Sequence, residues 1–147
     1  MKKLKALIIL LCFCLLISGC SEDIVVDKLY IPEGYKDKLE TMKMTEIAPM
    51  PYFKSPFITI TKDFEGKQYA VIFRENEEIE KVILPKTYES IVDIFETKGC
   101  KIEKYAQEFS NLQMFENNNK LYWYFSDEEK EIHLNLQGEE EDPFDKK

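Results

Sequence analysis

The chain has 147 residues, of which 44% are hydrophobic, 33% charged and 13% aromatic. This length favours a single domain, and the aromatic content excludes a fully disordered chain. Five Gly and six Pro exclude a collagen-like or low-complexity chain. Twenty basic and 28 acidic residues give a formal charge of −8. We therefore expect no nucleic-acid partner, because such a partner requires a basic footprint.

The first twenty residues have the pattern of an export signal. Residues 1–5 make a short cationic start, and residues 6–17 form an unbroken run of twelve apolar residues. A bilayer core about 30 Å thick needs about 20 helical residues to cross it. Twelve are too few for a stable span, but they are typical of a secretory signal peptide.

The ending LISGC, residues 16–20, resembles the lipobox of bacterial lipoproteins, in which an aliphatic residue and two small residues precede an obligatory Cys. The resemblance covers residues 1–20 alone. It implies that the thiol of Cys20 receives a diacylglycerol and that residues 1–19 are removed as a signal peptide. It also implies that the new N-terminus can be acylated, for example with palmitate. The mature protein would then be exported and anchored through Cys20 to the outer face of the cytoplasmic membrane, or to the outer membrane where the cell has one.

Processing at Cys20 changes both the cysteine content and the charge. Two of the four Cys lie in the removed segment and Cys20 carries lipid, so Cys100 is the thiol that remains and an intramolecular disulfide is excluded. The mature chain has 17 basic and 28 acidic residues, a net charge of −11. Anionic headgroups repel such a domain, so the lipid must hold it to the membrane. A basic protein is the expected partner.

The mature chain is expected to contain one folded unit. Residues 20–31 hold the lipidated Cys and a short tether, and residues 32–138 form a single domain. Residues 139–147 include a run of four acidic residues with nothing to bury, which predicts a frayed, disordered tail.

Two helices are predicted from the periodicity of apolar residues. Residues 32–44 carry apolar residues at helical spacing, namely Tyr35, Leu39 and Met42. Residues 87–98 have a clearer apolar stripe, with Thr87 placed to cap the first turn and Gly99 directly after the last.

Short apolar runs predict antiparallel strands; most of them alternate with polar residues, and the run at 68–74 is apolar on both faces. Three strands with short connections are expected to form a meander over residues 57–61, 68–74 and 79–84. Further strands are expected at residues 100–105, 112–115, 120–125 and 131–136. Residues 48–56 contain three Pro and are expected to form an irregular connector. The predicted fold class is therefore α+β, with a mainly antiparallel sheet of about six to seven strands.

The last two strands carry the candidate binding face. Keeping their apolar residues on one face requires that the numbers of directly opposed residues sum to an odd value. A four-residue loop at 126–129 satisfies this and puts Tyr122 opposite His133, and the preceding hairpin would have a loop at 116–119. The other face then carries polar and aromatic residues exposed to solvent, with tyrosines suited to binding. These candidate residues are Tyr122, Tyr124, His133 and Asn135.

The sequence contains none of the common catalytic or nucleotide-binding motifs, and His133 is its one histidine, which excludes a His-rich metal site. No metal, cofactor or catalytic residue is predicted. We expect a non-enzymatic binding or accessory protein of the cell envelope. Two alternatives stay open. One is a small carboxylate-dependent hydrolase, whose two acids need not be close in sequence. The other is an immunity-type or exclusion lipoprotein that blocks a toxin or a phage.

Overall fold

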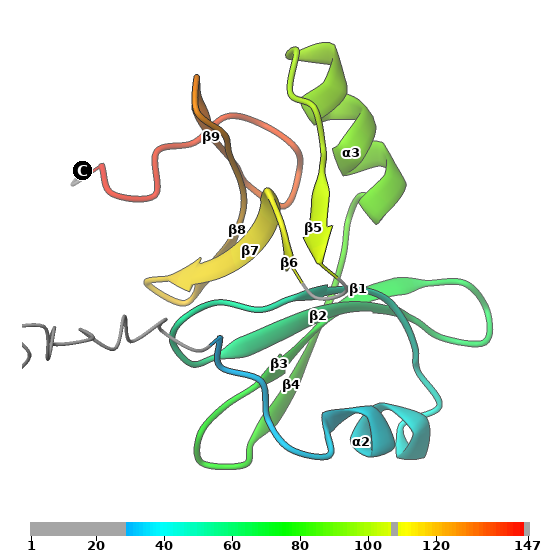
Figure 1. Ribbon diagram of the computed structural model, residues 1–147. Helices are drawn as coiled ribbons and strands as arrows, with labels where there is room; N and C mark the ends of the chain where they lie inside the picture. Colours follow the sequence, from blue (N-terminus) through cyan, green and yellow to red (C-terminus); the bar gives the residue numbers. More distant parts are fainter. Residues whose placement is uncertain (1–28, 107–108, 146–147) are drawn as a thin grey trace, which may run out of the picture.

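The computed structural model describes residues 29–106 and 109–145. The predicted signal peptide, Cys20 and most of the predicted tether lie outside the described residues. Within them the chain forms two helices, a four-stranded sheet, a three-stranded sheet and a short two-stranded ribbon, all with antiparallel pairing (Figure 1). The α+β class with mostly sheet is confirmed.

The four-stranded sheet follows the order of the chain, and its strands are β1 (Thr45–Met50), β2 (Phe57–Lys62), β3 (Gln68–Phe73) and β4 (Ile79–Ile83). The predicted meander over β2 to β4 is confirmed. The predicted connector at residues 48–56 is wrong in its first part, because β1 extends to Met50 and pairs with β2. Pro49 is tolerated there because β1 is an edge strand, where one side makes no ladder hydrogen bonds.

A second, three-stranded sheet contains the remaining long strands, which are β7 (Leu112–Asn117), β8 (Lys120–Ser126) and β9 (Glu131–Leu134). A short ribbon of β5 (Lys104–Ala106) and β6 (Phe109–Ser110) precedes it. The expectation of one sheet of six to seven strands is therefore wrong. The alternation of apolar residues places each strand, but it does not determine which strands pair in one sheet.

Both faces of the four-stranded sheet are covered. Helix α2 (Tyr35–Thr41) packs on one face, where Tyr35 and Leu39 join Phe57, Val71 and Phe73 in an apolar cluster. The other face packs against helix α3 (Tyr88–Thr97) and the three-stranded sheet, as Figure 1 shows. The core of that layer consists of the inward side chains of both sheets and of α3, among them Ile58, Ile72, Phe95, Trp123 and Phe125.

Helix α3 follows the sequence pattern closely. The Thr87 side chain accepts a hydrogen bond from the Ser90 backbone N–H at 3.2 Å, and Gly99 ends the helix with φ 76°. Ile91 and Phe95 are fully buried on its inner face. The helix prediction at 87–98 is confirmed to within one residue at each end.

The prediction that directly opposed residues of the last strands have numbers with an odd sum, here called the parity of the strands, is right. The register itself is shifted by two residues from the predicted one. Tyr124, and not Tyr122, lies opposite His133. The loop is residues 127–130, because the Asp127 carboxylate accepts hydrogen bonds from the backbone N–H groups of Glu129 and Lys130. The preceding hairpin turns at two residues instead of four, since Asn118 and Asn119 both adopt positive φ, as a tight hairpin turn requires.

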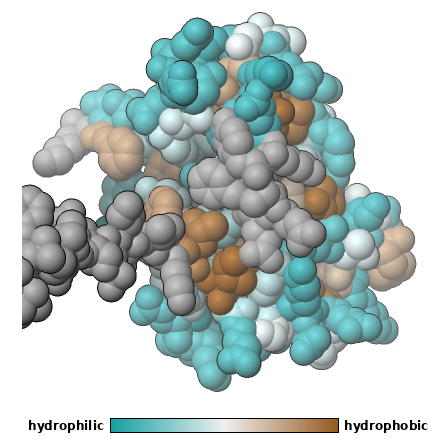
Figure 2. Space-filling view, viewed as in Figure 1, coloured by the Kyte–Doolittle hydropathy of each residue, from teal (hydrophilic) through white to brown (hydrophobic). Residues whose placement is uncertain are grey.

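The face of the molecule seen in Figure 2 is largely hydrophilic, with small hydrophobic patches between the hydrophilic regions. Six large hydrophobic side chains are exposed among the described residues, namely Tyr52, Phe53, Phe64, Ile79, Ile83 and Phe144. Three of the aromatic ones, Tyr52, Phe53 and Phe144, line two adjoining cavities on one side of the molecule.

Candidate functional site

The outer face of the three-stranded sheet carries the rings that the sequence singled out. In these strands the numbers of two directly opposed residues sum to an odd value, as predicted. Tyr122, Tyr124 and His133 therefore lie on the face opposite to the buried one that holds Trp123. Phe115 lies opposite Tyr122 and joins the same face. The rings of Tyr124 and His133 are stacked, with centroids 4.9 Å apart, and Phe115 contacts both edge-on.

The chain after β9 turns back over this face. Residues 135–145, here the C-terminal segment, begin with a turn built on Asn135. The side-chain oxygen of Asn135 accepts hydrogen bonds from the backbone N–H groups of Gln137 and Glu139, both at 3.0 Å. A β-bridge between Leu134 and Glu140 then directs the segment back along the sheet. The expectation of a disordered tail does not hold for residues 139–145, because these residues do have groups to pair with.

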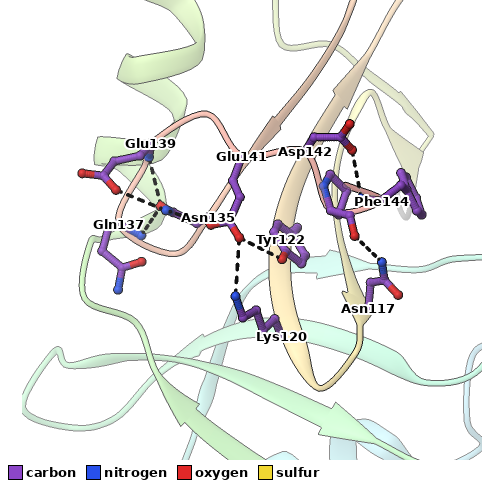
Figure 3. Close-up of polar contacts among 10 residues, drawn as sticks. Asn117, Lys120, Tyr122, Asn135, Gln137, Glu139, Glu141, Asp142 and Phe144 are labelled. Atoms are coloured by element: carbon purple, nitrogen blue, oxygen red, sulfur yellow. Dashed lines mark hydrogen bonds and ion pairs between the residues drawn. The ribbon is translucent and has the colours of Figure 1, made fainter. Parts of the chain in front are cut away.

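Glu141 fastens the C-terminal segment to the sheet. Its carboxylate accepts hydrogen bonds from the Tyr122 hydroxyl at 3.2 Å and from the Asn135 amide at 3.3 Å, and it forms an ion pair with Lys120 at 3.5 Å (Figure 3). The hydrogen bond from Asn135, with the charge of Lys120 and the bonds from Tyr122 and Lys120, lowers the pKa of Glu141. Tyr122 is only 4% exposed as a result of this packing.

Further along, the segment adds an aromatic ring to the face. The Asn117 side-chain amide donates a hydrogen bond to the Pro143 carbonyl oxygen at 2.6 Å, and Pro143 is buried. The next ring, Phe144, stacks on Phe115 with centroids 6.2 Å apart and meets His133 edge-on. Phe144 stays 65% exposed. The segment thus extends the aromatic surface beyond the sheet.

These rings line a groove. A cavity of about 190 Å³ is bounded by Phe115, Tyr124, His133, Phe144 and Glu131, together with Tyr52 from the loop after β1. A second cavity of about 290 Å³ adjoins it, since Tyr52 and Tyr124 line both, and Phe53 and Gln113 belong to its walls. We call these two cavities together the aromatic groove.

One side of the aromatic groove is acidic. Glu131 and His133 also line a neighbouring hollow of about 250 Å³, whose other walls include Glu140, Glu141 and Asp142. Glu140 and Glu141 form ion pairs with Lys98 and Lys120. Among the described residues, Glu131 and Asp142 have no basic partner within ion-pair distance. The edge of the groove therefore carries negative charge that the described part of the chain does not neutralise.

A separate cleft lies between the two sheets, with a volume of about 300 Å³. Its apolar floor comes from Ile72, Val82, Leu121 and Leu136, and its walls include Glu80, Glu116 and Glu141. Arg74 binds Glu116 and Glu80, and Lys120 binds Glu141. All three acids of the cleft are thus paired with cations.

The titration of these groups indicates which chemistry the cleft favours. The hydrogen bonds from Arg74 lower the pKa of Glu116, so that Glu116, like Glu141, is held in its ionised form. A general acid requires a carboxyl group whose pKa is raised instead. The thiol of Cys100 is buried and burial raises its pKa, whereas a nucleophilic Cys requires a lowered one.

The four candidate binding residues divide between two sites. Tyr124 and His133 line the aromatic groove, while Tyr122 and Asn135 line the cleft between the sheets. The expectation that Tyr122 lies on the solvent side is wrong, because the C-terminal segment covers it. The side-chain oxygen of Asn135 is occupied by the hydrogen bonds that form its own turn.

Sequence reasoning missed four rings of the groove, namely Tyr52, Phe53, Phe115 and Phe144. Phe115 carried a signal, since the parity that places Tyr122 also places it on the outer face. Phe144 follows the acidic run of residues 139–142, and nothing in the local pattern there indicates packing. Tyr52 lies in a proline-rich loop, and only its bridge to Tyr30 and the tertiary fold bring it to the groove.

Comparison with protein-family models, with curated proteins and with solved structures finds no match to this chain. Within residues 29–106 and 109–145, no helix is long and apolar enough to cross a membrane. The same residues contain no group of three or more His, Cys, Asp and Glu placed to hold a metal ion.

Proposed function

We propose that this protein is a lipid-anchored, extracytoplasmic binding protein of the bacterial envelope, and that it acts by holding a basic protein partner. Two features support this function: the sequence pattern of residues 1–20, and the aromatic groove with its acidic edge. In this proposal Cys20 holds the domain at the membrane and the groove faces the partner.

The groove supports a binding role because several exposed aromatic rings gather around the same cavities. Tyr52, Phe53 and Phe144 are 40%, 48% and 65% exposed, and they line adjoining cavities. Exposed apolar patches rimmed by polar residues mark interaction sites, and aromatic residues are enriched in such interfaces. A net charge of −11 in the mature chain favours a basic partner and speeds its encounter.

The cleft between the sheets gives less support to a hydrolase. Its acids are paired with Arg74 and Lys120, and the pKa values of Glu116 and Glu141 are shifted toward the ionised form. A carboxylate-dependent hydrolase needs one acid shifted the other way. A binding function needs no such group.

Site-specific cross-linking in intact cells tests the proposal. A photoreactive phenylalanine analogue placed at Phe53 is expected to capture a basic protein, because Phe53 lies on the wall of the groove. The matched control is the same analogue at Phe64, which is 87% exposed in the turn between β2 and β3. Capture from both positions to an equal degree, or from neither, would contradict the proposed function.

A further inference from the structure

We infer that the aromatic groove binds a cationic side chain, lysine or arginine, that a basic partner protein inserts between Tyr52 and the rings of the three-stranded sheet. This inference rests on the proposed function and names the group that the partner would present.

The size of the smaller of the two cavities favours a single side chain. The cavity lined by Tyr52, Phe115, Tyr124, His133 and Phe144 has a volume of about 190 Å³. Sites for whole small molecules usually measure about 300–1,000 Å³. The adjoining cavity of about 290 Å³ leaves space for neighbouring residues of an inserted segment, with polar groups such as Gln113 along its wall.

The lining favours a cation. The faces of aromatic rings carry partial negative charge and attract lysine and arginine within about 6 Å of the ring centre. Glu131 adds a full negative charge at the same cavity. Among the described residues, its carboxylate accepts one side-chain hydrogen bond, from the Tyr124 hydroxyl at 2.6 Å. Asp142 lies in the adjoining acidic hollow.

The protein's own lysines already show this contact elsewhere. The Lys81 ammonium lies 4.6 Å from the centre of the Tyr69 ring, and Lys36 and Lys67 lie over Tyr35 and Tyr69. Within the described residues, no lysine or arginine lies over a ring of the aromatic groove. Because Lys98 and Lys120 are engaged by Glu140 and Glu141, these nearby cations are already paired. A partner's cation would supply the missing charge.

The test measures binding of a labelled Gly-Lys-Gly-Lys-Gly peptide by fluorescence anisotropy. The full lipidated chain is held in a maltoside detergent, which has no ammonium group to compete. The peptide is expected to bind in the micromolar to millimolar range, and Gly-Gln-Gly-Gln-Gly is expected not to bind. Equal binding of the two peptides would overturn the inference, because a neutral amide cannot replace the cation.

Matched variants separate the groove from general charge attraction. Tyr52→Leu and Glu131→Gln are each expected to weaken binding of the lysine peptide about threefold to tenfold. Phe64→Leu likewise replaces an aromatic ring by Leu, and Glu128→Gln removes the same charge. Both lie at exposed positions that do not line the groove, and they are expected to leave binding within twofold. If Glu128→Gln weakens binding as much as Glu131→Gln, long-range charge explains the binding and the inference is wrong. Melting temperatures of the four variants show that each is folded.

Two further outcomes distinguish this inference from the proposed function. If choline chloride displaces the peptide at a lower concentration than free peptide does, the groove selects a small quaternary ammonium compound, and the inference of a partner side chain fails. If the peptides do not bind but Phe53 still cross-links a protein in cells, the proposed function stands and the inference alone fails. If the peptides do not bind and Phe53 does not cross-link a protein, the inference and the proposed function are both contradicted.

Discussion

The guanidinium of Arg74 binds both carboxylate oxygens of Glu116, at 2.7 and 2.9 Å, and so joins the four-stranded sheet to the three-stranded sheet. Arg74 directly follows β3, whereas Glu116 lies 42 residues later in β7. A further bond from Arg74 reaches Glu80 on β4 at 2.7 Å. The Glu116 side chain is only 14% exposed, so its charge is partly withdrawn from water and depends on Arg74.

We predict that Glu116→Gln lowers the free energy of unfolding by about 1–3 kcal/mol at pH 7, because Arg74 loses the more buried of its two charged partners. The hydrogen bonds from Arg74 hold the pKa of Glu116 below its ordinary value of 4.5. The folded state therefore has the lower pKa, so this stabilisation is present above about pH 4.5 and is lost as the pH falls through the lowered value. The difference between variant and wild type should shrink at pH 3.

Urea unfolding at pH 7 and pH 3 measures this difference. Glu75→Gln provides the control, since Glu75 is exposed in the turn between β3 and β4 and has no ion pair with any described residue. A difference for Glu116→Gln that stays constant between the two pH values would show that the carboxylate charge does not matter.

Trp123 is fully buried between the two sheets and α3, where its ring lies 6.1 Å from that of Tyr88. We predict that Trp123→Ala costs about 3–5 kcal/mol, a large part of the roughly 5–15 kcal/mol that stabilises a typical domain. Its indole N–H has no hydrogen-bond partner among the described residues. Trp123→Phe removes that unpaired group, so we expect it to cost less than half as much as Trp123→Ala. Thermal unfolding of both variants checks this order, and equal losses would contradict it.

Gly138 begins the return of the C-terminal segment with φ 81°, and a Cβ there would lie 2.6 Å from the Ile94 side chain. Gly66 has a similar φ of 83° but no atom within 4 Å of its added Cβ. Both substitutions to Ala incur the cost of a left-handed backbone, about 1–2 kcal/mol. We predict that Gly138→Ala costs about 1 kcal/mol more than Gly66→Ala, because Ile94 must move. Chemical unfolding of the two variants gives the difference directly, and equal costs would show that the segment adjusts freely.

The proposed lipid anchor at Cys20 can be tested separately. Cys20→Ala is expected to abolish fatty-acid labelling and to release the protein from the membrane fraction, since a lipobox signal requires the Cys thiol. Cys12 lies in the predicted signal peptide, so Cys12→Ala serves as the control and is expected to leave the labelling unchanged. Label and membrane retention that both survive Cys20→Ala would place the anchor elsewhere.

Sequence reasoning gave the local elements and the parity of the strands. Helix α3 was predictable because its apolar stripe, the Thr87 cap and Gly99 agree with one another. The strands from β2 to β4 and from β7 to β9 were predictable because most of them have alternating apolar residues, and because β3 is a short, continuous apolar run between turns. The same alternation placed Trp123 in the core and Tyr124 and His133 on the opposite face. These features depend on residues within a few positions of one another.

The tertiary structure decided what depends on distant residues. The division into two sheets follows from how two apolar faces pack on each other, and the alternation pattern is the same for either arrangement. The two-residue shift in register follows from hydrogen bonds to Asp127 and from the backbone of Asn118 and Asn119, which parity alone does not distinguish. Tyr122 is buried and Phe144 joins the groove because Glu141 and Pro143 bind side chains of β7 and β8, 19 to 26 residues earlier in the chain. Local pattern cannot predict such contacts, because the free energy of each depends on both partners being held in place by the whole fold.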